Sequence, residues 1–564
     1  MEHRLVIFSF RIFPKAFARR KYFFVSNRAL KQWFNGLEWF WDLKIFVFAL
    51  VMMVNREAYS QPGMTAAAHP RAYCLDAQGD DHNDGSKLHP WKTIHRLNAA
   101  RLHPGDSVLF QGGQEFAGTL QLDSSKSGTA AHCLWLGSYG NGYPLIDAGD
   151  SSALVLYLAK YITINNLRLK GAGRKEGNIK NGIAMIQCGH IRLENLDITG
   201  FQKSGLFIYA STEVEATSIF VHENGSAGIT VEGEEGKKSS RNIRISNCRA
   251  DDNPGDPTNL TNHSGNGIVV GHCTHVIIDH CSATNNGWDM PRIGNGPVGI
   301  WCYEADSVII QNCLSFHNKT SVGGADGGGF DLDGGVTNSI IQYCMSYGNQ
   351  GSGYCMFQYW GASPWYHNII RYNISENDGT VSDSRAGMYV WNSSGDKDQF
   401  YDCVCYNNTV FNAVEAALSF SDKSERKDFR FFNNIFVGKD SLIRGNKGLD
   451  VFLGNDWWSI SGGFNADGIR DFKTWATKYN REMQSGNMAG YNLDPGFVNP
   501  GHCNLTSAAA LRSFETYMLP QGSPLVDGGI DLAGVYHVHT GNFDFHRQHA
   551  LPKTIGALSA KTTK

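Results

Sequence analysis

Residues 242–253 read NIRISNCRADDN, and the same pattern returns as HVIIDHCSATNN (275–286), SVIIQNCLSFHN (307–318), NSIIQYCMSYGN (338–349) and, more weakly, NIIRYNISEND (368–378). In each copy, apolar residues alternate with polar ones, which is the period of a β-strand and not of a helix. Short units that recur at a fixed period must stack, because none can bury its apolar face alone. Since no helical pattern separates the strands, the repeat predicts a parallel β-helix.

Aligning the copies produces two columns of identical side chains. The first column holds Cys248, Cys281, Cys313 and Cys344. The second holds Asn253, Asn286, Asn318 and Asn349. Rungs about 4.8 Å apart place equivalent residues directly above one another. Asn tolerates the left-handed backbone of a tight turn, and stacked amides can bond along the column. We expect the Cys residues to be small buried hydrophobes, although neighbouring Cα atoms also fall within disulfide reach.

A second strand in each rung begins with Gly and places alternate residues inward and outward, as in Gly329-Phe330-Asp331-Leu332. One outward column is expected to hold Phe207, Thr230, Val269, Trp301, Asp331, Cys355 and Tyr389. The other is expected to hold Tyr209, Glu232, Gly271, Tyr303, Asp333, Phe357 and Trp391. Aromatic residues around two carboxylates on a solvent-facing strip indicate a binding groove.

Composition and the N-terminus indicate an exported protein with many strands. Only 18% of the 564 residues are charged, 63 are Gly and the net charge is -3, so nothing points to nucleic acid. The apolar run Ile45–Val54 follows Lys44 and precedes Ala58-Tyr59-Ser60, which is typical of a secretory signal and too short to span a bilayer. The alternative is an uncleaved membrane anchor. We expect a secreted or periplasmic protein without stable membrane insertion.

The order of patterns along the chain predicts four regions: an N-terminal extension with signal peptide (1–60), a linker, cap and first rungs (61–150), the β-helix core with its groove (151–440), and a helical excursion with last rungs and C-terminal cap (441–564). A short capping helix is expected within Thr93–Leu102, because the first rung would otherwise expose a bare strand edge. A second helix is expected at Asp471–Tyr479. Leu511–Ala557 should return to short strands that cover the far end.

The chain also resembles the secreted right-handed parallel β-helix proteins of the carbohydrate-active type, namely polysaccharide lyases and polygalacturonase-like glycoside hydrolases. The resemblance rests on LDAQGDDHNDGSKLHPWKTI (75–94), PGDSVLF (104–110) and GSPLVDG (522–528), and covers most of 73–558. It implies an all-β right-handed solenoid that acts on a carbohydrate. The polygalacturonase pattern of paired Asp and a downstream His-Gly is not present as such, so no catalytic residue is transferred from the family.

The candidate catalytic residues lie in the Gly-rich segment 323–335, which contains Asp326, Asp331 and Asp333. Asp331 and Asp333 share the outward face, with Cα atoms about 6.6 Å apart by strand rise. Glycoside hydrolysis uses one protonated carboxyl as the acid and one ionised carboxyl as the base or nucleophile. Two carboxyls this close separate their proton affinities. The alternatives for these residues are a Ca2+ site and plain turn chemistry.

The candidate substrate-binding residues surround these carboxyls in the predicted register. Aromatic rings can stack on the apolar faces of sugars, or they can simply fill gaps between loops. Two more carboxylates and three loop residues could also reach the substrate. The full set is Trp301, Tyr303, Tyr389, Trp391, Phe357, Glu304, Glu232, His263, Arg292 and Arg385.

We expect a monomeric glycoside hydrolase that needs no cofactor, with Ca2+ possible and no metal ligands assigned. A lyase acting on a uronate needs a base and a cation, yet neither outward column contains Lys or Arg from Phe207 to Trp391. A polysaccharide lyase therefore remains the alternative, with its base supplied by a loop. A third alternative is an exported glycan-binding solenoid without catalytic activity.

Overall fold

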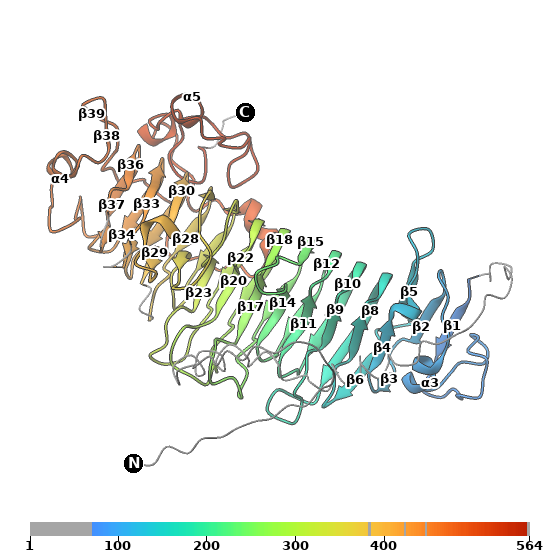
Figure 1. Ribbon diagram of the computed structural model, residues 1–564. Helices are drawn as coiled ribbons and strands as arrows, with labels where there is room; N and C mark the ends of the chain where they lie inside the picture. The colour runs from blue at the N-terminus through green and yellow to red at the C-terminus, as the bar shows by residue number, and fades with distance from the viewer. Residues whose placement is uncertain (1–69, 382–384, 422–424, 446–447, 561–564) are drawn as a thin grey trace, which may run out of the picture. The chain divides into compact units, whose positions relative to one another are not determined.

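The computed structural model describes residues 70–381, 385–421, 425–445 and 448–560. The predicted signal peptide lies outside these residues. The described chain forms a stack of parallel strands that runs from β1 (Ala72–Leu75) to β37 (Asp456–Ser459), as Figure 1 shows. Within the described ranges, no helix is long and apolar enough to cross a membrane.

Each central rung contributes three strands, and each strand pairs with its equivalent in the next rung. One rung consists of β18 (Cys273–Asp279), β19 (Ser282–Thr284) and β20 (Val298–Tyr303). The next consists of β21 (Asp306–Gln311), β22 (Leu314–Phe316) and β23 (Gly328–Leu332). All three pairs between these rungs are parallel. The predicted parallel β-helix is therefore confirmed.

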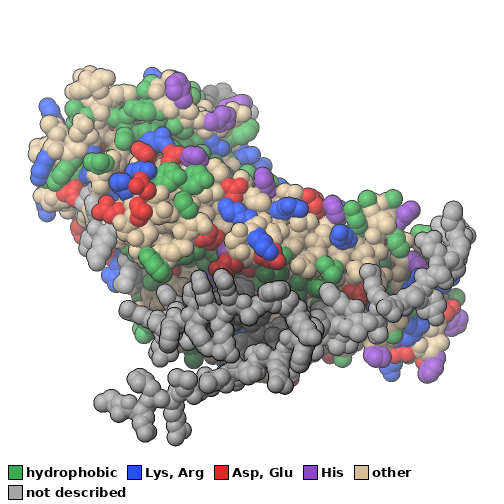
Figure 2. All heavy atoms as spheres, viewed as in Figure 1, with side chains coloured by type: hydrophobic (Ala, Val, Ile, Leu, Met, Phe, Trp, Pro, Cys, Tyr) green, Lys and Arg blue, Asp and Glu red, His purple; other side chains and the backbone are tan. Residues whose placement is uncertain are grey.

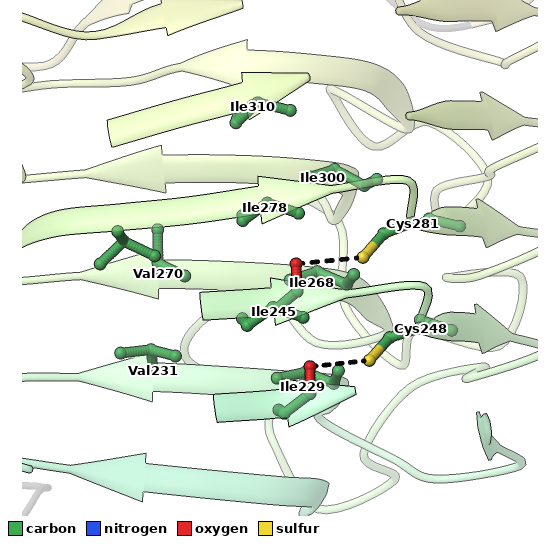
Figure 3. Close-up of a cluster of buried hydrophobic side chains, with 14 of the residues drawn as sticks. Ile229, Val231, Ile245, Cys248, Ile268, Val270, Ile278, Cys281, Ile300 and Ile310 are labelled. Atoms are coloured by element: carbon green, nitrogen blue, oxygen red, sulfur yellow. Dashed lines mark hydrogen bonds between the residues drawn. The ribbon is translucent and has the colours of Figure 1, made fainter. Parts of the chain in front are cut away.

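The interior of the coil is filled by aliphatic side chains from facing strands (Figure 3). One face supplies Ile229, Val231, Ile268, Val270 and Ile300, and the opposite face supplies Ile245, Ile278 and Ile310. All of them are fully buried. Burial of each such side chain contributes roughly 1.5–3 kcal/mol, so the free energy of folding accumulates rung by rung.

The predicted Asn column forms a hydrogen-bonded ladder. The Nδ2 of Asn253 donates to Oδ1 of Asn286, and Asn286 donates likewise to Asn318, both over 2.9 Å. The ladder continues through Asn349 and ends on Oδ1 of Asp378, at 2.8 Å. The left-handed turn conformation belongs to the preceding residue and not to the ladder Asn, because these amides must point inward to reach one another. The residues with positive φ are Asp252, Asn285 and His317, at 52° to 54°.

The Cys column is buried, and its four thiols are free. Backbone N–H groups donate to the next sulfur, as from Cys281 to Sγ of Cys313 at 3.4 Å. The thiols also lie against backbone carbonyls: Sγ of Cys281 donates to the carbonyl oxygen of Ile245 at 3.6 Å (Figure 3). Beyond Cys344, Asn takes over the same position in a second ladder, which ends on the carboxylate of Glu482. Its members are Asn373, Asn408, Asn434 and Asn455.

Both predicted helices are present. Helix α3 (Ile94–Ala99) begins after the N-cap Thr93 and buries Ile94 and Leu97 at the N-terminal end of the core. Helix α4 (Phe472–Tyr479) begins after the N-cap Asp471. Its buried Trp475 meets Trp457 of β37, with ring centroids 5.6 Å apart. Helix α4 therefore packs on the last rungs.

The prediction of short strands at Leu511–Ala557 is wrong. This segment instead contains the 3-10 helices η3 (Ala508–Ser513) and η4 (Pro524–Val526) and the helix α5 (Leu532–Tyr536). It packs against the outer side of the coil, where Leu511 and Leu525 join a cluster with Phe411 and Ile435. Its backbone bonds to turns of the coil, as from Gly556 N–H to the carbonyl of Asn433 at 2.8 Å. Gly and Pro interrupt the alternation that a strand needs.

Charged side chains of both signs are interspersed on the face shown in Figure 2, and the described residues form no broad basic area on that face. The space-filling view therefore offers no electrostatic footprint of the kind that a nucleic acid requires there.

The carboxyl at the end of the first ladder makes stability depend on pH. Burial raises the pKa of Asp378 from 3.8 to about 7. A raised folded-state pKa stabilises the protein below the unfolded pKa, and this stabilisation is lost as pH rises through about 7. We expect Tm to fall between about pH 4 and about pH 8, by an amount that reflects roughly 4 kcal/mol. The fall should shrink in Asp378→Asn and not in the exposed control Asp150→Asn; an equal fall in both would contradict the assignment.

Candidate functional site

Parallel pairing places the candidate residues in the predicted outward columns. Trp301 of β20 lies opposite Asp331 of β23, and Asp331 lies opposite Cys355 of β26 (Tyr354–Gln358). Cys355 in turn lies opposite Tyr389 of β29 (Ala386–Asn392). The flanking residues Phe330 and Leu332 belong to the core, so Asp331 points away from it. The register on which the site depends is confirmed.

The expectation that this face is open to solvent is wrong at its centre. Asp331 is 2% exposed, Trp301 is 4% exposed and Cys355 is fully buried. Loops that precede the strands pack over the column: His263, from the loop before β17 (Asn266–Gly271), lies edge-on to the Trp301 ring at 5.0 Å. Such contacts connect a loop of one rung to a residue of another rung. The alternation of residues within a strand therefore does not predict them.

Three carboxyl groups come together at this face. Asp326 lies in the loop before β23, and its Oδ2 accepts a hydrogen bond from the Gly296 N–H at 2.8 Å. Asp333 directly follows β23, and its Oδ1 accepts from the Gly334 N–H at 2.7 Å. Oδ1 of Asp331 has no hydrogen-bond partner. Asp326 and Asp333 are half-buried, in contrast to Asp331.

Burial raises the proton affinity of all three groups, and repulsion from neighbouring carboxylates adds to it at Asp331 and Asp333. Burial raises the pKa of Asp331 far above its usual range, and the charges of Asp333 and Asp326 add to this. Burial raises the pKa of Asp326 to about 6. Burial, with smaller effects from Asp326 and Glu304, raises the pKa of Asp333 to about 7. At neutral pH the cluster therefore holds at least one proton, and Asp331 is its most favourable carrier.

The glycines around these carboxyls make room for neighbouring side chains. A Cβ at Gly329 would overlap Oγ of Ser346 on the next rung, and a Cβ at Gly334 would overlap the ring of Tyr359. These two glycines are thus required by close packing within the protein.

Glu232 forms a hydrogen-bonded cluster beside the carboxyls. Its Oε1 lies 2.7 Å from Nδ1 of His272, and its Oε2 accepts from the Tyr303 hydroxyl. Burial opposes protonation of His272, but the hydrogen bond and charge of Glu232 outweigh it and raise the His272 pKa. The Tyr303 ring stacks on Trp301 at 5.4 Å. Both oxygens of Glu232 have hydrogen-bond partners, so this carboxylate orients the Tyr303 ring. His272 was not among the residues predicted from the sequence.

Asn266 fixes the other side of Trp301. Its Oδ1 accepts from the indole Nε1 at 3.0 Å, and its Nδ2 lies 3.0 Å from Nδ1 of His263. Burial, with the positive charge of Arg292, lowers the pKa of His263 to about 4. His263 is therefore neutral at physiological pH and accepts the Asn266 amide proton on Nδ1. Sequence reasoning missed Asn266, because a single Asn at the start of a strand carries no distinctive signal.

The remaining predicted residues have partners of their own. Oε1 of Glu304 accepts from the Ser363 N–H at 2.8 Å. Arg292 donates to the carbonyl of Asn295 in its own loop, and Arg385 lies 3.9 Å from Glu415. The Phe357 ring lies edge-on to two other predicted aromatic residues, Tyr389 at 5.5 Å and Trp391 at 5.7 Å. In the described chain, no three His, Cys, Asp or Glu side chains are arranged to hold a metal ion.

Comparison with known proteins places the chain in a family. Residues 73–383 match the family model described as "Pel9A-like, right handed beta helix region". The chain therefore belongs to the Pel9A-like right-handed β-helix family. This membership confirms the resemblance inferred from the sequence and establishes the hand of the coil.

One curated relative and several solved structures are similar. A lacto-N-biosidase from Bifidobacterium longum subsp. longum is 24% identical over an alignment that covers 87% of this chain and 35% of the relative. The chain thus spans about a third of that relative's length. A GH136 lacto-N-biosidase from Eubacterium ramulus aligns with a TM-score of 0.46 at 19% identity, over 64% of this chain and 68% of that chain. Pectate lyase Pel9A aligns with a TM-score of 0.42 at 14% identity, over 88% and 97%.

The Glu232 cluster predicts a specific pattern of stability. Glu232→Ala leaves the Tyr303 hydroxyl and His272 without their partner, and we expect a loss of roughly 1–3 kcal/mol in the free energy of unfolding. Glu232→Gln keeps an acceptor for the Tyr303 hydroxyl and should lose less. Urea unfolding of both variants, with the exposed neighbour Glu235→Ala as control, measures the difference. A loss in Glu232→Ala no larger than in the control would contradict the cluster.

Proposed function

We propose that this protein is a glycoside hydrolase that cleaves an oligosaccharide or polysaccharide at Asp326, Asp331 and Asp333. The observation that supports it most strongly is the gathering of three carboxyls whose proton affinities differ. The similarity to a lacto-N-biosidase also supports glycoside hydrolysis. Release of a disaccharide should therefore be tested first. The proposed chemistry uses carboxyl groups alone and needs no cofactor.

The geometry favours Asp326 and Asp333 as the working pair, in place of Asp331 and Asp333. A catalytic carboxyl must contact the glycosidic bond or the attacking water, and only the half-buried Asp326 and Asp333 retain exposed surface to do so. Asp331 is buried with a strongly raised pKa. We assign it a positioning role: as a neutral acid between the other two, it limits the negative charge of the cluster.

The two accessible carboxyls divide the roles by proton affinity. Between the pKa of Asp326, about 6, and that of Asp333, about 7, the proton resides mainly on Asp333. Asp333 would then donate this proton to the leaving oxygen. The ionised Asp326 would activate water or attack the sugar.

The same electrostatics disfavour a lyase. β-Elimination requires neutralisation of a uronate carboxylate, and the candidate site places Asp326, Asp331, Asp333 and Glu304 near one another. The outward columns offer no Lys or Arg to offset this charge. A uronate would be repelled, whereas a neutral sugar would not. A non-catalytic glycan binder would not require a buried carboxyl with an unpaired oxygen, such as that of Asp331, which is costly to maintain.

We further propose that the protein acts outside the cytoplasm as a monomer. The basis for the location outside the cytoplasm is the apolar run Ile45–Val54, with its preceding Lys44 and following small residues.

The carboxyl pKa values predict a bell-shaped dependence of kcat/KM on pH, because kcat/KM reports the ionisation of the free enzyme. Activity requires an ionised Asp326 and a protonated Asp333, so it should fall below about pH 6 and above about pH 7. The two limbs belong to the coupled cluster and not to single residues. Initial rates across the pH range measure the profile; a rate that keeps rising well into the alkaline range would contradict these roles.

Substitution of the carboxyls separates catalysis from binding. Asp326→Asn and Asp333→Asn should each lower kcat by roughly a hundred- to ten-thousandfold, while the Kd for saccharide stays within about threefold. Asp331→Asn keeps a neutral side chain and should lose roughly tenfold or less. Product analysis on lacto-series oligosaccharides, chitin oligomers and oligogalacturonides, with ultraviolet detection of unsaturated uronates, tests the reaction class. Unsaturated products, or full turnover by both accessible-carboxyl variants, would refute the proposal.

A further inference from the structure

Trp360 exposes its indole in a way that packing does not explain. It follows β26 and is 74% exposed, the highest value for any tryptophan in the described ranges. Trp365, five positions later in the same loop, is fully buried and donates from Nε1 to the carbonyl of Leu332 at 2.9 Å. One loop thus places one indole in the core and holds another in solvent. Tryptophan is enriched at binding interfaces because its ring offers a large apolar face together with a polar N–H.

Hydrogen bonds hold the backbone on both sides of Trp360, so the loop that carries the indole is anchored. The Trp360 N–H donates to Oγ of Ser393 at 3.0 Å. Nε2 of the fully buried Gln358 donates to the Ser363 carbonyl at 2.9 Å. The Ser363 N–H in turn donates to Oε1 of Glu304 at 2.8 Å. A surface that is already ordered binds a ligand with a smaller loss of entropy than a mobile one.

These contacts attach the loop to the segment that carries Asp333. Oε1 of Gln358 accepts from the Gly335 N–H at 3.1 Å. The ring of Tyr359 lies against Gly334, where it leaves no room for a Cβ atom. The two residues before Trp360, Gln358 and Tyr359, therefore contact the stretch immediately after Asp333 through their side chains.

We propose that Trp360 is the platform of an additional sugar-binding position next to the carboxyl cluster. It binds a ring of the same saccharide chain that the cluster cleaves, so this inference rests on the proposed function. The aromatic face takes the apolar face of a sugar ring, at a low cost in side-chain entropy. Glu304, which is bonded to the same loop, restricts that ring to a neutral or amino sugar, because a uronate would meet its negative charge.

The test is binding by an inactive protein that carries Asp333→Asn, which separates affinity from turnover. Lacto-series oligosaccharides, chitin oligomers and oligogalacturonides of increasing length are titrated by calorimetry. Trp360→Ala should raise the Kd for the longest neutral or amino oligosaccharide by roughly tenfold, and leave the shortest unchanged. Trp360→Phe should fall between. The control is Trp288→Ala, since Trp288 is also exposed but lies in the loop before β20.

The outcomes distinguish this inference from the proposed function. Equal affinities of the Trp360→Ala and Trp288→Ala proteins for ligands of every length would contradict a sugar-binding role of Trp360. A failure of every saccharide to bind would contradict it as well. A loss of affinity that is the same for all lengths would also overturn it, because it would place Trp360 at the cleaved ring. If the Asp333→Asn protein still turns over while Trp360→Ala weakens only long ligands, the carboxyl assignment fails and the platform stands.

Discussion

The register between successive rungs is the constraint on which the rest of the structure depends. A slip of one residue in a strand turns every side chain to the opposite face, so it would move Asp331 into the core and Phe330 out of it. Two internal ladders oppose such a slip. The Asn ladder from Asn224 to Asp378 and the Cys and Asn column that ends on Glu482 each require the same atom to meet its equivalent in every rung. Buried amides that lost this match would be left unpaired.

The fixed register allows the protein to keep three carboxyls close together, and no Lys or Arg among the described residues forms an ion pair with them. Asp331 has an oxygen without a partner, and its own burial together with Asp326 and Asp333 raises its pKa. Such an arrangement destabilises the folded state, and the aliphatic core of the coil offsets it. Strain of this kind is expected at a functional site and is difficult to explain as a requirement of the fold. Aromatic residues held by Glu232 and Asn266 complete the same face.

The periodic part of the fold could be read from the sequence, and the non-periodic part could not. Strand alternation and the repeat were sufficient to place Trp301, Asp331 and Cys355 in one column. They could not show that the column is covered, because the cover consists of loop residues such as His263. Strand alternation also failed to predict the C-terminal segment, because its Gly and Pro residues follow no period. It could not single out Trp360, because the exposure of that residue is not visible in the sequence. The assignment of Asp331 as catalytic followed from the same omission, since alternation indicates direction and says nothing about solvent.

The most direct test of this account is the ionisation state of Asp331. Difference infrared spectra of the wild-type protein and the Asp331→Asn variant isolate the carboxyl stretch of this one residue. Burial beside Asp326 and Asp333 predicts that the wild-type protein shows a protonated carboxyl band at neutral pH and that the variant lacks it. A carboxylate band from Asp331 at neutral pH would show that the side chain is solvated or paired with a cation, and would contradict the buried cluster.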